Sequence, residues 1–398
     1  MIGIIGDTHF GAGYNMGGVD RKTQLNTRLL DFSNVFNQII DRFHKKGVKV
    51  VVLTGDIFET RHPTSAQLNA FSTCVQRAIK LGMEIVINVG NHDQQRNIST
   101  TTVDVFDALR LPFLKIYQRI AVHKVEDVNI ILMPYRDRRM VGAKTNSEAI
   151  EMIKNELNGV IDNLTGKKVV VGHFMLEKSP DGSDPDTFSL NELILPINMF
   201  PGCDVVIMGH VHQHEMVSAS LNNPTIIYSG SMDKVSFGEK DHQKVSLILD
   251  PENIHDIEVI KTDVRNLYEL NFDYIDEKKP FKKEINNKII SDIDDFNKNQ
   301  PIKNSIVKVI VRVKENDLYY VKQPLINDYV LSKGVKYCTG IQVTSINTRQ
   351  LRNSTINETL SGKKAFAAYL DGVNSESDKM KKKLLKRAEE IIEEVEVK

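Results

Sequence analysis

The sequence of 398 residues has little of several features that mark particular classes of protein. It contains no tryptophan, its 52 Lys and Arg residues balance its 52 Asp and Glu residues, and its three cysteines, Cys74, Cys203 and Cys338, lie far apart. Cysteines at these spacings offer neither a zinc-binding CxxC pair nor a disulfide framework. A net charge of zero excludes a globally basic protein, so any nucleic-acid site has to be a local patch.

Long apolar runs are also missing, and none approaches the length of a membrane span. The opening residues 1–5 are too short and uncharged for a signal peptide. We therefore expect a cytoplasmic protein without a membrane anchor. A chain of this length exceeds what one hydrophobic core usually supports, which predicts two or three domains.

The first two thirds of the chain alternate short apolar runs with amphipathic stretches, a pattern typical of a layered α/β domain. Strands are predicted over residues 2–5, 48–53, 85–89, 128–133, 168–171, 204–208 and 225–228. Helices are predicted over residues 26–46, 65–81 and 147–164, where apolar positions recur at helical spacing.

The composition changes after about residue 263. Residues 276–299 are rich in Lys, Asp and Asn, residues 306–313 alternate as a strand does, and residues 353–363 are polar like a linker. Residues 364–370 and 375–396 are predicted to be helical. The predicted division is a first domain over 1–265, a smaller α+β domain over 266–345, and a linker with terminal helices over 346–398.

Five polar motifs follow predicted strands, and each contains or adjoins glycine. They are Asp7-Thr8-His9, Gly55-Asp56, Gly90-Asn91-His92-Asp93, Gly172-His173 and Gly209-His210-Val211-His212. The carboxyl ends of strands in an open α/β sheet meet at one crevice, so these loops are expected to converge. One such motif alone is more often an ordinary turn, but five in this order favour a metal site.

The residue types suit divalent cations of intermediate softness. Carboxylate, amide oxygen and imidazole favour Mn²⁺, Fe²⁺ or Zn²⁺, and the lack of thiolates argues against structural zinc. Asp56 is a candidate bridge because a carboxylate has two oxygens, and two bridged cations can clamp a phosphoester. The remaining histidines are expected to be surface or core residues, including His62 and His214 near the motifs.

This set of motifs resembles the signature D-x-H, G-D, G-N-H-D/E, G-H and G-H-x-H of the calcineurin-like metallophosphoesterases. The resemblance implies a four-layer α/β fold, a β-sandwich flanked by helices, with a small α+β capping domain and C-terminal helices. It implies two metal ligand sets with one shared carboxylate: Asp7, His9, Asp56 and His212, and Asp56, Asn91, His173 and His210. It further implies that His92 acts on the scissile phosphate as general acid or transition-state stabiliser and that Asp93 orients His92.

Narrower features resemble one branch of these enzymes. Tyr228–Ser231 with Phe237–Glu239 is similar to the Y-x-G-S … F-x-E element of SbcD-type nucleases and their MRN-complex relatives, and Met133–Tyr135 is similar to their L-P-Y strand end. Residues 55–59 with 63–64 resemble the G-D-x-F … P-S segment of the same branch. Within this branch, the sequence resembles phage recombination-endonuclease subunits most. Glu59 departs from the branch, where His or Asp is common, which puts an assisting role at that position in doubt.

The resemblance implies a DNA exonuclease and endonuclease subunit of an SbcCD-like complex for double-strand-break repair and recombination. It would use two Mn²⁺, with Mg²⁺ supporting weaker activity, and form a homodimer bound to an SbcC-like ABC-type ATPase through its terminal helices.

Apolar stripes in helix 65–81 and segment 102–109 are the predicted dimer face, or else pack on the sheet. The alternatives are a phosphoesterase acting on nucleotides or phosphoproteins, and a binding scaffold with a vestigial site. Arg136, Arg138 and Arg139 either hold phosphates or belong to a solvated loop.

Overall fold

A computed structural model describes residues 1–94, 100–177, 179, 192–220, 223–275, 284–346, 366 and 380–388. The chain divides into two compact units. The first unit comprises Met1–Glu269, Asn299–Lys308 and Asp328–Gly340, and the second comprises Leu270–Lys298, Val309–Asn327 and Ile341–Lys398. The division predicted at residues 265 and 345 stays a prediction.

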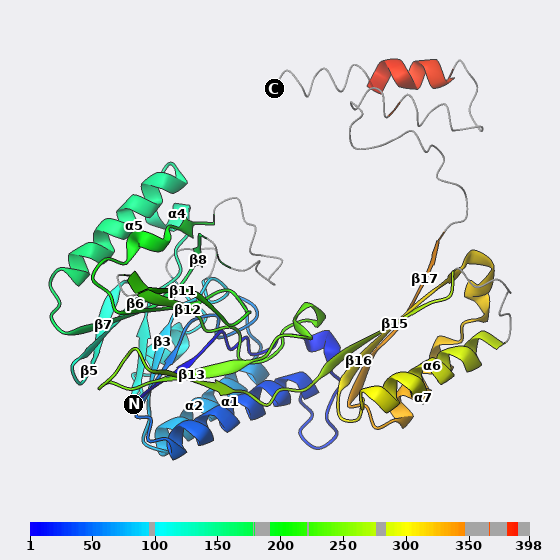
Figure 1. Cartoon of the computed structure of the whole chain (residues 1–398), viewed down its shortest axis with the longest axis horizontal. Helices are drawn as coiled ribbons and strands as arrows, with labels where there is room; N and C mark the ends of the chain where they lie inside the picture. The colour runs from blue at the N-terminus through cyan, green and yellow to red at the C-terminus, as the bar shows by residue number, and fades with distance from the viewer. Residues whose placement is uncertain are drawn as a thin grey trace. The chain divides into compact units, whose positions relative to one another are not determined.

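Two mixed six-stranded sheets form the first unit (Figure 1). One has the order β14-β13-β1-β2-β3-β4 and the other β11-β12-β10-β7-β6-β5. The strands of the first sheet are β1 (Ile2–Ile5), β2 (Val50–Leu53), β3 (Glu84–Asn88), β4 (Leu114–Tyr117), β13 (Val245–Leu249) and β14 (Ile257–Lys261). Those of the second sheet are β5 (Ala121–Val125), β6 (Val128–Met133), β7 (Lys167–His173), β10 (Val205–Gly209), β11 (Glu215–Ser220) and β12 (Asn223–Tyr228).

The main helices of the first unit cover the outer faces of the two sheets (Figure 1). They are α1 (Thr27–Lys45), α2 (Ser65–Lys80) and α5 (Asn146–Ile161), with shorter α3 (Asp104–Ala108) and α4 (Arg138–Val141). This unit also contains three 3₁₀ turns, η1 (Tyr14–Met16), η3 (Ile197–Met199) and η4 (Phe237–Glu239), and a short pair of strands, β8 (Met175–Leu176) and β9 (Ile194–Leu195).

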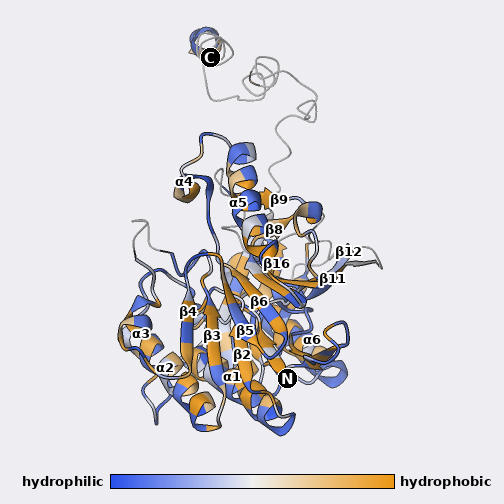
Figure 2. Cartoon of the chain, turned by 90° about the vertical axis from the view of Figure 1, so that its left-hand side faces the viewer, coloured by the Kyte–Doolittle hydropathy of each residue, from blue (hydrophilic) through white to orange (hydrophobic). Residues whose placement is uncertain are grey.

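Alternation along the strands builds a four-layer core. In β2, Val51 and Leu53 pack in the cluster with α1 and α2, whereas Val50 and Val52 pack in the cluster between the sheets. In β10, Val206 and Met208 pack with α5 instead. Successive strand residues point to opposite faces, so strands buried on both faces read as continuous apolar runs. Figure 2 shows β2 and β6 largely in the hydrophobic colour, whereas α1 and α2 carry both colours. The predicted four-layer fold is confirmed.

Helix α1 shows why the sequence folds in this way. Asn26 caps its first turn by accepting a hydrogen bond from the Arg28 amide at 2.8 Å. Its buried face includes Phe32, Phe36 and Phe43, which pack on the first sheet. Gly47, at φ 77°, follows the helix in the left-handed conformation that ends many helices.

The predicted dimer stripes pack within the chain instead. Phe71 and Val75 of α2 and Phe106 of α3 are buried in the same core cluster as the first sheet. These side chains are therefore not available to a second copy, because burial on the sheet already removes them from water. Leu109, at the end of this stretch, remains 61% exposed.

The second unit contains helix α6 (Ile285–Asn299), which the sequence did not predict, and the 3₁₀ helix η6 (Glu315–Tyr320). Asn286 of α6 donates to the Tyr320 carbonyl at 2.8 Å and accepts from the Lys322 amide at 2.8 Å. Strands β15 (Leu267–Asp273), β16 (Ile306–Lys314) and β17 (Tyr337–Ile346) form a three-stranded sheet, with α7 (Gln323–Ser332) between β16 and β17.

The predicted terminal helices lie outside the described residues except for residue 366 and a helix over 380–388. None of the described helices has the length and apolar character needed to cross a membrane.

Candidate metal centre

The ends of parallel strands bring the predicted motifs together. β1, β2 and β3 run parallel, and Asp7, Asp56 and Asn91 follow their carboxyl ends. In the facing sheet β7 and β10 also run parallel, β7 ends on His173, and His210 follows β10. The two sheets share a core, so their loop ends meet at one edge.

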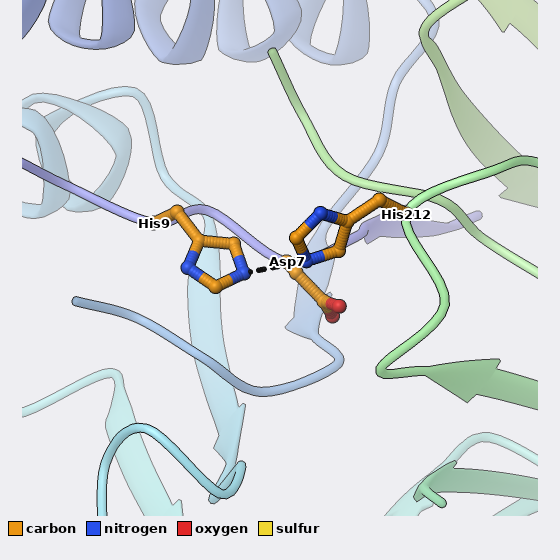
Figure 3. A group of neighbouring side chains, drawn as sticks. All are labelled: Asp7, His9 and His212. Atoms are coloured by element: carbon orange, nitrogen blue, oxygen red, sulfur yellow. Dashed lines mark hydrogen bonds between the residues drawn. The ribbon is translucent and has the colours of Figure 1, made fainter. Parts of the chain in front are cut away.

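The first cluster consists of Asp7, His9 and His212, whose candidate ligand atoms lie within 4.8 Å of one another. Figure 3 shows the Asp7 carboxylate beside the two rings, with a dashed line between the imidazoles. The two Nε2 atoms are 2.9 Å apart. All three side chains are at most 3% exposed, so this polar group is closed off from water.

The second cluster consists of Asp56, His173 and His210, again with candidate ligand atoms within 4.8 Å. Asn91 belongs to the same group, because its Oδ1 lies 2.9 Å from His173 Nε2 and 3.1 Å from His210 Nδ1. The structure thus brings all seven predicted ligand residues into two adjoining clusters.

Asp56 lies between the clusters. Its Oδ2 is 3.2 Å from His173 Nε2 and 3.7 Å from His9 Nε2, while its Oδ1 accepts a hydrogen bond from the His92 amide at 2.8 Å. Asp56 Oδ2 is buried, and its contacts among the described residues are with the ring nitrogens of His173 and His9. A buried carboxylate oxygen facing two imidazoles is an arrangement that fits a divalent cation. The donor set of oxygen and imidazole nitrogen also fits divalent metals.

The backbone at three of these residues is strained. His9, Asp56 and His210 have φ values of 40°, 47° and 85°, a region that residues with a Cβ rarely adopt. Such strain persists only where the surroundings enforce it, and it concentrates at functional sites. Gly90 is equally constrained, because a Cβ there would lie 2.2 Å from Asp56 Oδ1.

Fixed partners set the protonated nitrogen of the histidines in the second cluster. His173 Nδ1 lies 3.1 Å from the Thr54 carbonyl oxygen, which can only accept, so Nδ1 carries a proton and Nε2 faces Asp56 and Asn91. His210 is held the other way, because its Nε2 contacts the Glu192 carboxylate and its Nδ1 faces Asn91. Each ring therefore turns its other nitrogen toward the cluster, and that nitrogen has a lone pair for a cation when the ring is neutral.

The first cluster has the same arrangement. His212 Nδ1 lies 2.8 Å from Glu239 Oε1, and His9 Nδ1 lies 2.9 Å from Glu59 Oε2. Both rings then direct Nε2 toward each other. His9, Glu59 and His92 are also close enough to form a metal-binding triad, but a neutral His9 ring has one lone pair, which already faces Asp7 and His212. We therefore assign Glu59 as the residue that orients His9.

His92 and Asp93 belong to the same loop but make different contacts. His92 Nδ1 lies 2.6 Å from the Glu59 carbonyl oxygen, so this nitrogen carries a proton. Asp93 is fully buried and accepts hydrogen bonds from the amides of Gly90 at 3.0 Å and Ile57 at 2.9 Å, which joins the two ligand loops. The predicted roles of His92 in catalysis and of Asp93 in orienting it stay predictions.

Burial and charge act in opposite directions on these groups. Burial lowers the pKa of His173, but the nearby carboxylates of Asp56 and Asp7 outweigh it and raise the pKa to about 9. Burial and the charge of Asp56 raise the pKa of Asp93 to about 7. The raised pKa values of His173 and Asp93 both indicate an excess of negative charge around them, which cations would neutralise, whereas the neighbouring histidines hold the pKa of Asp56 well below its usual range despite burial.

Two residues that the sequence singled out, Tyr135 and Arg136, and one that it missed, Glu192, make contacts beside these motifs. Tyr135 places its ring 6.1 Å from the His210 ring and stacks on Phe174 at 5.9 Å. Arg136 pairs through Nη1 with Glu156 at 2.7 Å, while its Nε and Nη2 are buried without a hydrogen-bond partner among the described residues. Glu192 has no motif in the sequence that marks it, because its contact with His210 depends on tertiary folding.

Comparisons with known proteins agree with this geometry. The family model for calcineurin-like phosphoesterases matches residues 1–214. The SbcD subunit of the nuclease SbcCD from Staphylococcus epidermidis is 22% identical over 257 residues, which cover 61% of this chain and 65% of that protein. DNA double-strand break repair protein Mre11 of Methanosarcina mazei is 24% identical over 336 residues, 82% of this chain and 47% of that protein.

The chain spans about half to two thirds of the length of these curated relatives. Among solved structures, a dimetal phosphatase from Danio rerio aligns with a TM-score of 0.38 at 11% identity, over 66% of this chain and 95% of that chain. The matched family segment contains every residue of the two clusters and covers more than half of the sequence. This protein therefore belongs to the calcineurin-like phosphoesterases.

Proposed function

We propose that the protein is a Mn²⁺-dependent DNA nuclease that hydrolyses phosphodiester bonds at this two-cluster centre. The observation that carries the proposal is Asp56 Oδ2, a buried carboxylate oxygen that faces a histidine of each of the two donor clusters. Similarity to SbcD and Mre11, whose names describe a nuclease and a DNA-break repair protein, supports DNA as the substrate.

The residues that would hold the metals divide into two sets sharing one carboxylate: Asp7, His9, Asp56 and His212, and Asp56, Asn91, His173 and His210. Two divalent cations bound there would supply an activated water and neutralise the charge that develops on the phosphate. Mn²⁺ fits the mixed imidazole and carboxylate donors, and Mg²⁺ would support weaker activity because it prefers oxygen ligands.

His92 is the proposed proton donor to the leaving oxygen. Its Nδ1 proton is engaged by the Glu59 carbonyl, which fixes the ring, and Nε2 is the nitrogen proposed to exchange a proton with substrate. The buried side chain of Asp93 holds the His92 loop against the Asp56 loop. Together these contacts would hold the imidazole beside the metal centre before the reaction begins, so that little conformational entropy is lost in reaching the transition state.

The proposed partners are DNA, a second copy of this chain and an SbcC-like ABC-type ATPase. For the dimer, we propose the apolar surface at α3 and just beyond it, where Val105, Leu109 and Phe113 are 48%, 61% and 61% exposed. A Leu109→Asp variant is expected to become monomeric in light scattering at micromolar concentration. For the ATPase, truncation after Asn353 is expected to abolish binding in a pull-down while ATP-independent cleavage survives.

Purified protein with Mn²⁺ tests the central proposal on linear duplex DNA and on a small generic phosphodiester. We expect DNA cleavage that EDTA abolishes and that His92→Ala reduces strongly. Hydrolysis of nucleotides or phosphopeptides without DNA cleavage would instead support the alternative phosphoesterase. Mn²⁺ binding without hydrolysis of any phosphoester would show that the protein is not an enzyme of this class.

A further inference from the structure

The 3₁₀ helix η4 brings an acidic side chain against the metal centre. Glu239, the last residue of η4, is 1% exposed and lies with its Oε1 2.8 Å from His212 Nδ1. Glu239 is 27 residues from His212 in the sequence and is not among the predicted ligands. Its Oε1 faces the ring nitrogen that points away from Asp7 and His9, so Glu239 does not compete for a cation.

The other oxygen of Glu239 is held by three donors. Oε2 accepts from Lys244 Nζ at 2.5 Å, from the Val235 amide at 3.1 Å and from Ser231 Oγ at 3.3 Å. The contacts of both oxygens, Oε1 with His212 and Oε2 with Lys244 and the Val235 amide, therefore fix the carboxylate in one orientation.

Lys244 is the counterpart of this carboxylate. It is 1% exposed, and its Nζ also donates to the His212 carbonyl at 3.0 Å and to Ser231 Oγ at 2.6 Å. Lys244 thus contacts the backbone of His212 while Glu239 contacts its ring. The residue directly precedes β13, which pairs antiparallel with β1, the strand that leads into Asp7.

We propose that Glu239 and Lys244 are a positioning pair that fixes the Nδ1-protonated form of His212 and aims its Nε2 at the cation held with Asp7 and His9. The assignment rests on the proposed two-metal function. It follows from the general behaviour of metal-binding histidines, whose second nitrogen is commonly held by a carboxylate that raises ligand strength. Here the carboxylate is itself held by a buried lysine, so its position does not depend on solvent.

The competing explanation is that Glu239 only neutralises a buried lysine. The two explanations separate when both charges are removed. Replacing Glu239 alone leaves Lys244 buried and unpaired, which destabilises the fold whatever its role in metal binding. Replacing both removes that penalty, but still leaves His212 Nδ1 without its acceptor. Methionine suits both positions because it fills similar volume without a charge.

The experiment compares the full-length wild-type chain with Glu239→Met, Lys244→Met and the double variant. Mn²⁺ binding is measured by calorimetry, and metal-free thermal unfolding is measured in EDTA. A His212→Ala variant identifies which of the two binding transitions belongs to that ligand. Glu258→Met with Lys46→Met, which removes a surface ion pair of 2.7 Å, is the matched control and should change neither measurement.

We expect Glu239→Met to lower the unfolding temperature and the double variant to recover it. In the double variant, the Mn²⁺ affinity of the site identified by His212→Ala should remain about 10–100-fold below that of the wild type. The Mn²⁺ affinity of the other site should stay within about threefold of the wild-type value. Wild-type affinity at both sites in the recovered double variant would overturn the assignment, as would equal losses at both sites.

DNA cleavage is not part of this readout. Two Mn²⁺ bound by a chain that does not cut DNA would contradict the proposed nuclease, and the affinity pattern would still decide the role of Glu239. A wild-type chain that binds no Mn²⁺ would overturn both proposals.

Discussion

The carbonyl oxygen of Glu59 lies 2.6 Å from Nδ1 of His92, while the carboxylate of the same Glu59 lies 2.9 Å from Nδ1 of His9. One residue thus contacts a predicted metal ligand through its side chain and the predicted proton donor through its backbone. A side-chain substitution at Glu59 therefore changes the first contact and preserves the second.

For His92→Ala we expect Mn²⁺ and DNA binding to persist while cleavage falls by ~10²–10⁴-fold, the usual loss for a general acid. The expectation follows because the seven ligand residues form two clusters without the His92 ring. Calorimetry with Mn²⁺ and single-turnover cleavage of duplex DNA check it. A lost Mn²⁺ transition would show that His92 is a ligand.

For Asp56→Asn both Mn²⁺ transitions should weaken, because Asp56 Oδ2 faces histidines of both clusters. Cleavage should fall by at least ~10³-fold, since metal ions supply several kcal/mol of transition-state stabilisation. Asp127→Asn is the control, because Asp127 is 61% exposed and pairs with Lys167 on the surface. Loss of one transition alone would argue against a bridge.

Glu59→Gln should weaken Mn²⁺ at the His9 site by about 10–100-fold, because His9 loses the charge that orients its ring. Raising Mn²⁺ should restore the cleavage rate, since the contact of His92 with the Glu59 carbonyl survives. Titration of the cleavage rate with Mn²⁺ tests this, with Glu258→Gln as control. A rate that stays low at saturating Mn²⁺ would place Glu59 in the chemical step.

Mn²⁺ affinity should rise with pH up to about 9. His173 has a pKa of about 9 in the metal-free chain, above its ordinary 6.5, so at pH 7 a cation has to displace its proton. The same shift stabilises the metal-free fold fully below about pH 6.5 and is lost as the pH rises to about 9. Calorimetry in buffers of different ionisation heat should detect about one proton released at pH 7 and almost none at pH 10. Equal proton release at both values would contradict this prediction.

Gly90→Ala should cost about 1–3 kcal/mol of folding stability and weaken both Mn²⁺ transitions, because a Cβ would lie 2.2 Å from Asp56 Oδ1 and 2.3 Å from its amide nitrogen. Gly159→Ala in α5 is the control, since its Cβ would meet nothing within 4 Å. Thermal unfolding with and without Mn²⁺ measures both effects. Unchanged metal binding in Gly90→Ala would show that the Asp56 loop adapts.

The central strands and long helices could be predicted because local pattern and burial agree there. The predicted strand at 128–133 and the observed β6 coincide, and helix 65–81 differs from α2 by one residue. Strands β13 and β14 were not predicted, and neither was α6. Helix α6 has a buried face of Ile285, Ile289 and Ile293 at helical spacing. Because the residues between them are mostly Lys, Asp and Asn, the segment as a whole is polar and its helical periodicity was overlooked.

The ligand residues could be predicted because each follows a strand with glycine beside it. The residues that hold those ligands could not. Glu192 and Lys244 act on His210 and on Glu239 through contacts that span 18 and 5 residues, and no local pattern separates them from surface charges. Glu239 was identified in the sequence only as part of the Y-x-G-S … F-x-E element that resembles SbcD-type nucleases. No physical role was predicted for it.

His9 and His212 are separated by 203 residues, yet their Nε2 atoms lie 2.9 Å apart. Closing a loop of this length carries a large entropy cost that only the packed sheets recover. A growing chain on the ribosome therefore cannot gather the first cluster until β10 and His212 have emerged and docked against β1. Metal capture therefore depends on the closing of the two sheets on each other, and metal uptake during refolding would report when that has happened.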